Sequence, residues 1–396
     1  MGPTTERSGE VEYALLSTEA GLSLLREVAI VPDPGPSDHR RWRRTATAES
    51  VSAAIRLIEG RRRGAVKFSR ADRMWFSPTA LEQSTSEAVA RHKATRFAGA
   101  DVVDLCCGLG GDAIALASVA RRVVAVDRDS AMLRRTLWNA RAYEVAERLL
   151  AIRARAETFP LLDGMLVHVD PDRRSGGRSR ARVVADYVPG IDVLRRIAAQ
   201  ARGGAIKLGP ASDFAHYFGD PEYEAEVISL NGECKEATIW FGVLAGCRRR
   251  ATSLPSGETW TGRDGPAGSA SPGDLGAWVH EPDPALSRAG LLDGFALAHD
   301  RKRFLANINL LTGADRLNSG WVVNFAVERV LPLDMRVIRR EMSCARLAVR
   351  EIKTRGLDRP TPEEARHILR SEGGDPVTVF LLNGREGSRA ILARRT

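Results

Sequence analysis

The 396-residue chain carries 59 Lys and Arg against 50 Asp and Glu, which gives a net charge of +9. Its composition, 43% hydrophobic and 28% charged, is typical of a soluble globular protein with two or three domains. No apolar run approaches the roughly 20 residues that a membrane helix needs, and the first residues, MGPTTERSGEVEY, lack the apolar core of a secretory signal.

The five cysteines are odd in number and show no metal-ligand spacing. We therefore expect reduced thiols, no bound metal and a cytoplasmic location. The basic charge permits contact with nucleic acid. Only six of the 59 basic residues are lysine, however, and heavy arginine use can reflect the base composition of a genome. Charge alone therefore identifies no partner.

The first 98 residues are predicted to form a helical region. TEAGLSLLREVA and ESVSAAIRLIEGRRR repeat apolar residues every three or four positions, which is the period of an amphipathic helix. The turn-forming stretch PDPGPSD separates them. A third helix is expected over LEQSTSEAVARHKATRFA.

From Asp101 onward, short apolar runs alternate with amphipathic helical segments. The candidate strands are DVVDLCC, RVVAVD, LLAIRA, GMLVHV and GGAIKLG, and their alternation with helices predicts a parallel sheet with right-handed crossovers. EAEVISL and EATIWFGVLAG are joined by a short link that includes Asn231-Gly232, which favours an antiparallel hairpin. We therefore expect an α/β domain over residues 99–260.

The stretch SGETWTGRDGPAGSASPGD is rich in Gly, Ser and Pro, and it predicts a linker or long loop at residues 261–275. Residues 276–396 are predicted to form a small α/β domain. Its expected helices lie near PALSRAGLLDGFALAH and over TPEEARHILRS, and its expected strands are ARLAVREIKT, PVTVFLL and RAILARR.

A glycine-rich turn, VVDLCCGLGGDA, follows the first predicted strand. Gly108 and Gly110 allow a ligand to approach the backbone closely. The spacing of the glycines, with Asp127 19 residues after Gly108, also fits a dinucleotide site, so a dehydrogenase is one alternative. Asp104 favours another ligand, because a carboxylate there would repel a pyrophosphate but would suit the sulfonium and ammonium of S-adenosylmethionine. Asp127 can accept hydrogen bonds from ribose in either case.

The sequence VVDLCCGLGGD resembles motif I of class I S-adenosylmethionine-dependent methyltransferases. Its Cys-Gly-x-Gly-Gly form is similar to the trimethylguanosine synthase (RNA cap guanine methyltransferase) group. MWFSPTALEQSTSEAVARH resembles the segment before motif I in that group, with Trp75, Phe76, Ser77 and Thr85 matching. The resemblance implies a Rossmann-like seven-stranded sheet of strand order 3-2-1-4-5-7-6.

The same resemblance implies which residues bind the cofactor. The methionine part of S-adenosylmethionine is expected near Asp104, Cys106, Gly108 and Gly110, with Thr85 nearby, and its ribose is expected on Asp127. The family often has an Asp after strand three for the adenine amine, and this chain has Arg155 there. Glu157 or a backbone group is therefore expected to take that role.

The loop HVDPDRRSGGRSR follows the fourth predicted strand, at the edge where open α/β sheets bind ligands. Amino-methyltransferases carry Asp/Asn-Pro-Pro-aromatic in this loop, and this chain has Asp170-Pro171-Asp172-Arg173. We predict that Asp170 accepts a hydrogen bond from a substrate amine and that Pro171 stiffens the turn and frees its carbonyl as a second acceptor. Asp172 is expected either to be that second acceptor or to orient Arg173. Asp170, Pro171 and Asp172 are the predicted catalytic residues, since methyl transfer depends on positioning and on stabilising developing charge.

The substrate contacts are less well defined, because the aromatic residue that would stack on a base is missing. Arg173 or Trp75 is expected to supply that platform. Arg174 is a further predicted substrate contact, and so is Lys207 at the end of the fifth strand.

The C-terminal segments WVHEPDPALSRAGLL, VREIKTRGLDRPTPEEARHIL and DPVTVFLLNGREGSRAILARR resemble the THUMP-like domain of bacterial class I methyltransferases. THUMP domains proper bind RNA, so the resemblance implies an RNA partner. Lys353, Arg355 and Arg359 are candidate phosphate contacts.

We therefore predict S-adenosylmethionine-dependent methylation of a base nitrogen of RNA, with guanine favoured. Methylation of a protein or small molecule is one alternative, and a non-catalytic RNA-binding protein on a methyltransferase scaffold is another. No motif specifies the target nucleotide, the RNA class or the oligomeric state.

Overall fold

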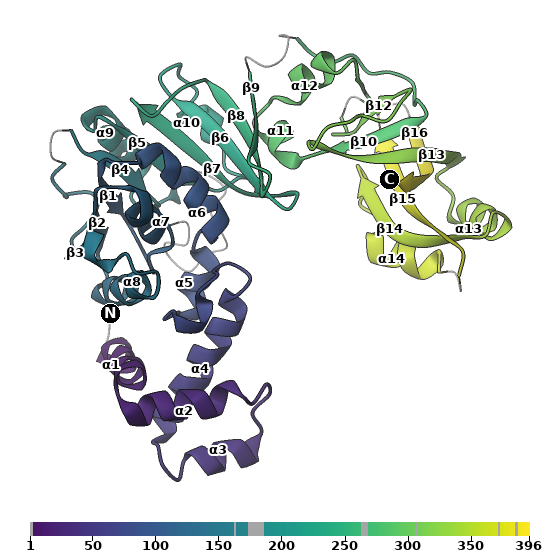
Figure 1. Cartoon of the computed structure of the whole chain (residues 1–396). Coiled ribbons are helices and arrows are strands. Elements are labelled where there is room, and N and C mark those ends of the chain that lie inside the picture. Colours follow the sequence, from purple (N-terminus) through teal and green to yellow (C-terminus); the bar gives the residue numbers. More distant parts are fainter. Residues whose placement is uncertain are drawn as a thin grey trace. The chain divides into compact units, whose positions relative to one another are not determined.

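The computed structural model describes residues 3–161, 164–172, 186–262, 268–305, 307–370, 373–384 and 387–396. The chain forms two compact units (Figure 1). One contains Met1–Glu222 and Thr238–Ala245, and the other contains Tyr223–Ala237 and Gly246–Thr396.

The first unit begins with a group of helices, as predicted. They are α1 (Pro3–Ser17), α2 (Glu19–Ala29), α3 (Pro36–Trp42) and α4 (Ala48–Gly64). The hydroxyl oxygens of Thr18 and Thr47 cap α2 and α4 by accepting the backbone N–H groups of Gly21 and Ser50. The apolar stripes of these helices form a core of their own, which includes Leu24, Val28, Val51, Leu57 and Trp75.

The expected third helix is instead two helices, α5 (Pro78–Gln83) and α6 (Glu87–Ala94). The chain is extended at Ser84 and again at Ser86, which is the N-cap residue of α6. Lys67 stabilises the break, because its ammonium donates to the carbonyls of Leu81, Glu82 and Ser84 at 2.8 to 3.1 Å. Serine and threonine favour such helix ends over helix interiors.

A nine-stranded sheet follows, with strand order β3-β2-β1-β4-β5-β7-β6-β8-β9. Strands β1 to β5 are parallel, and the pairs are β1–β2, β2–β3, β1–β4 and β4–β5. The bounds are β1 (Asp101–Leu105), β2 (Arg122–Asp127), β3 (Leu149–Arg153), β4 (Leu166–Val169), β5 (Gly203–Leu208), β6 (Glu224–Leu230) and β7 (Glu233–Gly242). The intervening helices are α7 (Gly111–Val119), α8 (Ser130–Ala142), α9 (Ile191–Gln200) and the short α10 (Phe214–Tyr217).

The predicted strand order is present, but the prediction of seven strands is wrong. Strand β8 (Arg249–Leu254) pairs in parallel with β6, and β9 (Glu258–Thr261) pairs with β8 in an antiparallel hairpin. Strand β8 starts with two arginines, which are not typical of a buried strand, although Ala251, Thr252 and Leu254 further along it are buried. Gly257, whose φ is +76°, belongs to the tight turn of this hairpin.

The C-terminal part has a second sheet of seven strands in the order β11-β12-β10-β13-β16-β15-β14. Both predicted helical segments and all three predicted strands are present, whereas β10 to β13 and α13 were not predicted. The strands are β10 (Trp278–Pro282), β11 (Lys302–Arg303), β12 (Leu311–Gly313), β13 (Val322–Pro332), β14 (Leu347–Arg355), β15 (Asp375–Gly384) and β16 (Gly387–Arg395). The helices are α11 (Pro284–Arg288), α12 (Leu292–Ala298), α13 (Met335–Cys344) and α14 (Pro362–Ile368).

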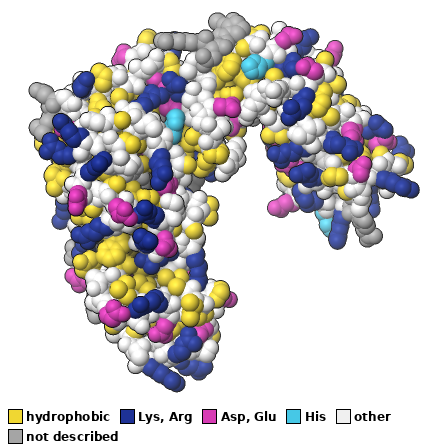
Figure 2. All heavy atoms as spheres, viewed as in Figure 1, with side chains coloured by type: hydrophobic (Ala, Val, Ile, Leu, Met, Phe, Trp, Pro, Cys, Tyr) yellow, Lys and Arg dark blue, Asp and Glu magenta, His cyan; other side chains and the backbone are white. Residues whose placement is uncertain are grey.

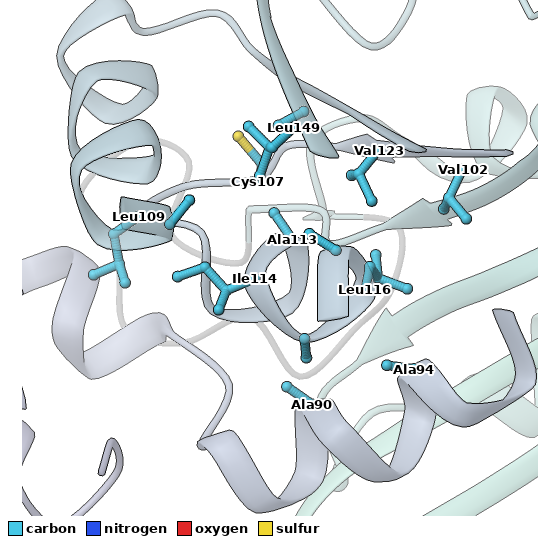
Figure 3. Packing of buried hydrophobic residues seen from close by; sticks show 14 of the residues in the cluster. Ala90, Ala94, Val102, Cys107, Leu109, Ala113, Ile114, Leu116, Val123 and Leu149 are labelled. Carbon is cyan, nitrogen blue, oxygen red and sulfur yellow. The ribbon is translucent and has the colours of Figure 1, made fainter. Parts of the chain in front are cut away.

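Helix α6 packs closely against α7 in the main core of the first unit. Ala90 and Ala94 of α6 face α7 in Figure 3, and both are buried. Their small side chains permit a short distance between the two helices. That packing brings Lys93, which lies between them in the sequence, to Asp112 in the first turn of α7.

Among the residues that the structure describes, no helix is long and apolar enough to cross a membrane. Within the same residues, no group of His, Cys, Asp or Glu side chains could hold a metal ion.

Candidate active site

A cavity lies at the carboxyl ends of β1, β2 and β4, where the segment before α6 also reaches it. Its described lining is strongly acidic, with seven carboxylates against two guanidinium groups. The acidic residues are Asp104, Asp112, Asp127, Asp129, Glu157, Asp170 and Asp172, and the basic ones are Arg128 and Arg155. Such a wall attracts a cationic ligand and disfavours the pyrophosphate of a dinucleotide.

The turn between β1 and α7 adopts the backbone conformations that its glycines permit. Gly108 has a φ of +57°, and a Cβ there would meet no heavy atom within 4 Å, so this part of the backbone is open to a ligand. Gly110 has a φ of +91° at the N-cap of α7, and a Cβ there would lie 3.0 Å from Thr136 Cγ2. Gly110 therefore supports close packing on α8 and lies behind the wall. Cys106 lines the cavity with a φ of +61°.

Asp104 is the most deeply buried carboxylate of the wall, with a side chain 1% exposed. Its Oδ1 lies 2.7 Å from Nδ1 of His168, whereas its Oδ2 is buried and has no hydrogen-bond partner. Burial raises the pKa of this carboxyl group above its usual value. An unpaired buried carboxylate oxygen in an acidic cavity fits the amino group of S-adenosylmethionine.

Asp127 ends β2 on the next part of the wall. Its oxygens accept the backbone N–H groups of Gly108 and Asp129 at 3.0 and 2.9 Å, and each oxygen keeps a lone pair for a ribose hydroxyl. Burial raises the pKa of Asp127. Arg155 and Glu157 both line the cavity, with Nε and Oε2 3.5 Å apart, on the side that follows β3.

The two thiols of the turn are poor nucleophiles. Burial, together with nearby carboxylates, raises the pKa of Cys106 and of Cys107 well above the usual value. Covalent chemistry on these sulfur atoms is therefore disfavoured.

Thr85 lines the cavity, and its hydroxyl is bonded to Asp112. Its hydroxyl donates to Asp112 Oδ2 at 2.5 Å, and Lys93 Nζ donates to Asp112 Oδ1 at 2.8 Å. Burial alone would raise the pKa of Asp112, but its basic neighbours Lys93, His168 and Lys207 together outweigh this effect and hold the pKa well below the usual range. Asp112 is therefore ionised.

The loop after β4 presents two carboxylates at the cavity mouth. Asp170 Oδ2 accepts a hydrogen bond from Lys207 Nζ at 2.6 Å. Asp172 Oδ1 accepts one from the Gln83 amide at 3.2 Å, and its Oδ2 lies 3.7 Å from Arg128 Nη2. Pro171 is buried between them and also lines the cavity.

Several predicted substrate contacts lie elsewhere. Trp75 is 1% exposed in the N-terminal core, where its ring N–H donates to Glu12 at 2.8 Å, so no ring face is open to a base. Lys207 is 4% exposed and lies behind Asp170. Arg173 and Arg174 are outside the described residues.

Sequence reasoning missed other residues of the site, namely Lys93, Asp112, Gln83, Arg128 and the Val188–Pro189 pair. Lys93 left a signal in the sequence. It shares a helical stripe with Val89, Ala90, Ala94 and Phe97, all of which are buried. A lysine on such a stripe indicates a buried ion pair.

Comparisons with known proteins agree with this geometry. The RNA cap guanine-N2 methyltransferase family matches residues 99–175, from just before β1 into the loop after β4. In two strains of Mycobacterium tuberculosis, a protein described as an uncharacterized S-adenosylmethionine-dependent methyltransferase is 35% identical over 324 residues. Each alignment covers 79% of this chain and 86% of the relative.

A similar fold has been solved by crystallography. It belongs to a provisional methyltransferase of Porphyromonas gingivalis W83, with a TM-score of 0.73 and 20% identity over 95% of this chain and 98% of that one. The fold, the acidic cavity and the sequence identity all indicate the same family. The chain belongs to the S-adenosylmethionine-dependent methyltransferases.

Proposed function

We propose that the protein methylates a base nitrogen of an RNA, with guanine as the favoured base. The observation that carries this proposal is the carboxylate of Asp170 at the end of β4. Strand β4 pairs with β1 so that Val169 lies opposite Leu105, next to Asp104. Asp170 therefore borders the same cavity as the cofactor residues.

S-adenosylmethionine supplies an activated methyl group on a sulfonium. Asp170 can accept a hydrogen bond from one N–H of an exocyclic amine, which holds the nitrogen in place and stabilises the positive charge that develops on it. As the new N–C bond forms, the S–C bond breaks, and the amine then loses one proton to solvent. Asp172 and the carbonyl of Pro171 offer further acceptors.

The Val188–Pro189 pair supplies an apolar part of the wall beside these acceptors. Asp172 and Val188 are joined by two backbone hydrogen bonds of 2.7 and 3.0 Å. We infer that this apolar surface contacts the face of the base, in place of the aromatic residue that the loop lacks.

The match to an RNA cap guanine-N2 methyltransferase family supports RNA as the substrate class. A second support is the distribution of charge. Residues 335–370 contain ten basic and five acidic side chains, so this short segment accounts for more than half of the net charge of the chain.

The predicted phosphate contacts in this segment are engaged with acidic residues. Lys353 and Arg355 both pair with Glu281 at 2.8 and 2.9 Å, and Arg359 pairs with Glu364 at 3.3 Å. A different set of arginines, here called the helical arginine face, is exposed and has no acidic partner among the described residues. It consists of Arg336, Arg339 and Arg340 of α13, Arg366 of α14, and Arg370 just after it.

Helices α13 and α14 pack on one hydrophobic cluster through Ile338, Met342, Ala365 and Leu369, so their outer surfaces belong to the same side of the second sheet. Figure 2 shows Lys and Arg side chains over this part of the molecule. An unpaired arginine face is suited to phosphate groups.

The proposal is tested by comparing modified nucleosides, by mass spectrometry, in RNA from wild-type and deletion strains. One methylated nucleoside should be absent from the deletion strain and restored by the wild-type gene but not by Asp170→Ala. Methyl acceptance that survives RNase treatment of the substrate pool would instead favour a protein or small-molecule substrate.

RNA contact by the helical arginine face is tested separately. Arg366→Ala with Arg370→Ala should weaken RNA binding and flatten its salt dependence, by about 0.7 in slope for each lost phosphate contact. Arg359→Ala is the matched control, because Arg359 belongs to the same segment but is paired with Glu364.

A further inference from the structure

Four buried ionisable side chains meet beneath the glycine turn. They come from four elements: Lys93 from α6, Asp104 from β1, Asp112 from α7 and His168 from β4. Their exposed fractions lie between 0 and 7%. Burying a lysine and a histidine among carboxylates is costly unless their contacts are specific.

The contacts determine where the imidazole proton lies. Lys93 Nζ is 3.3 Å from His168 Nε2, and an ammonium can only donate, so Nε2 accepts this hydrogen bond. The proton of the ring is then on Nδ1, which donates to Asp104 Oδ1 at 2.7 Å. His168 is therefore neutral in this arrangement.

The charges of the cluster do not cancel. Asp104 and Asp112 are two negative charges and Lys93 is one positive charge, while His168 is neutral. Next to the cluster, Lys207 and Asp170 neutralise each other at 2.6 Å. One negative charge is left over, and Asp104 Oδ2 is the buried carboxylate oxygen without a partner.

We propose that Lys93 and His168 are positioning residues for the amino group of the cofactor. Lys93 keeps the proton of His168 on Nδ1, and His168 then holds Asp104 by Oδ1, so that Oδ2 keeps its lone pairs for the cofactor. The ammonium of the bound cofactor supplies the missing positive charge.

The test measures binding of two ligands by isothermal titration calorimetry. S-adenosylhomocysteine has the amino-acid end, whereas 5′-methylthioadenosine has the same adenosine and thioether but lacks that end. His168→Leu should weaken S-adenosylhomocysteine binding by about 10- to 100-fold, the range for losing a hydrogen bond to a charged group. Binding of 5′-methylthioadenosine should stay within about twofold, since on this scale twofold is a small fraction of one hydrogen bond.

His168→Asn is the rescue variant, because its amide N–H can donate to Asp104 from near the position of Nδ1. It should recover most of the affinity for S-adenosylhomocysteine. If His168→Leu fails to fold, this variant and Lys93→Met decide the proposal.

Lys93→Met should weaken S-adenosylhomocysteine binding, while binding of 5′-methylthioadenosine stays within about twofold. Without Lys93, no ammonium holds the ring proton on Nδ1. The proton can then lie on Nε2, which is 3.9 Å from Asp112 Oδ1, and Asp104 loses its donor. The loss should be smaller than in His168→Leu, because the tautomer with the proton on Nδ1 remains available.

Arg135→Met is the matched control for removing a buried cation. Arg135 Nη2 pairs with Glu12 at 2.9 Å, their side chains are 8% and 11% exposed, and the pair lies at Trp75 in the N-terminal core. This variant should leave the ratio of the two affinities unchanged. The proposal is overturned if His168→Leu lowers both affinities equally or changes neither, and no RNA enters the measurement, so the result is independent of the proposed substrate.

Discussion

The carboxylates at the two ends of the cavity differ in burial and in hydrogen bonding. At the end proposed to bind the amino-acid part of the cofactor (the methionine end), Asp104 is fully buried and one of its oxygens has no partner. At the end proposed to bind the substrate amine (the target end), Asp170 and Asp172 are partly exposed. Asp170 is already bonded to Lys207, and Asp172 to Gln83 and Arg128.

The methionine end therefore has a free acceptor before the ligand binds, whereas at the target end a ligand must replace hydrogen bonds within the protein. A buried oxygen without a partner costs free energy until a donor arrives, so the methionine end is prepared for one cation. At the target end an incoming amine must compete with protein donors for the carboxylates. We therefore expect cofactor binding to depend on the first end alone and turnover to depend mainly on the second.

The largest effect is expected from Asp170→Ala. Losing the group that orients and stabilises the attacking nitrogen should lower the rate of methyl transfer about 10²- to 10³-fold. The measurement is incorporation of labelled methyl groups into RNA from a deletion strain. The affinity for S-adenosylhomocysteine should change little. A loss of this affinity as large as the loss of rate would contradict the expectation that cofactor binding depends on the methionine end alone.

Asp104→Asn should weaken cofactor binding, which Asp170→Ala should leave nearly unchanged. Replacing the carboxylate by an amide removes the charge that receives the ammonium, and it should weaken S-adenosylhomocysteine binding by about 100-fold. Calorimetry with 5′-methylthioadenosine is the control, because that ligand lacks the amino group. An equal loss for both ligands would mean that the substitution disturbs the whole cavity.

The pH dependence of cofactor binding should reflect the ionisation of the Asp104 carboxyl group. Its pKa in the free protein is raised by burial, and the ammonium binds the ionised form. As the pH falls through this raised pKa, S-adenosylhomocysteine affinity should drop about tenfold per pH unit, and above it the affinity should be constant. Binding of 5′-methylthioadenosine, measured over the same range, should not share this drop.

Lys207→Met should have the smallest effect. It removes the donor that holds Asp170 but leaves the carboxylate itself, so the rate of methyl transfer should fall by only about tenfold, the worth of one charge-assisted hydrogen bond. Cofactor affinity, measured by calorimetry, should be unchanged. A loss as large as that of Asp170→Ala would show that Lys207 contacts the substrate directly.

Much of the sheet and of the cofactor wall could be predicted because each depends on local pattern. The runs around β1 to β5 alternate with helices, and within this pattern Asp104 lies inside a predicted strand, Asp127 ends one and Asp170 directly follows one. What could not be predicted depends on side chains from distant segments. Trp75 looks like a stacking platform until Glu12, 63 residues away, is seen to satisfy its ring N–H.

The placement of three lysines around the cavity offers a way to monitor the active site. Of the six lysines in this arginine-rich chain, Lys67, Lys93 and Lys207 donate to groups at or behind the cavity wall. A compact ammonium suits these narrow positions better than a planar guanidinium. An amine-acetylating reagent should therefore modify exposed Lys302 early and leave buried Lys93 and Lys207 unmodified until the cavity opens. The acetylation state of two amines, read by peptide mass spectrometry, then reports whether the active site is intact.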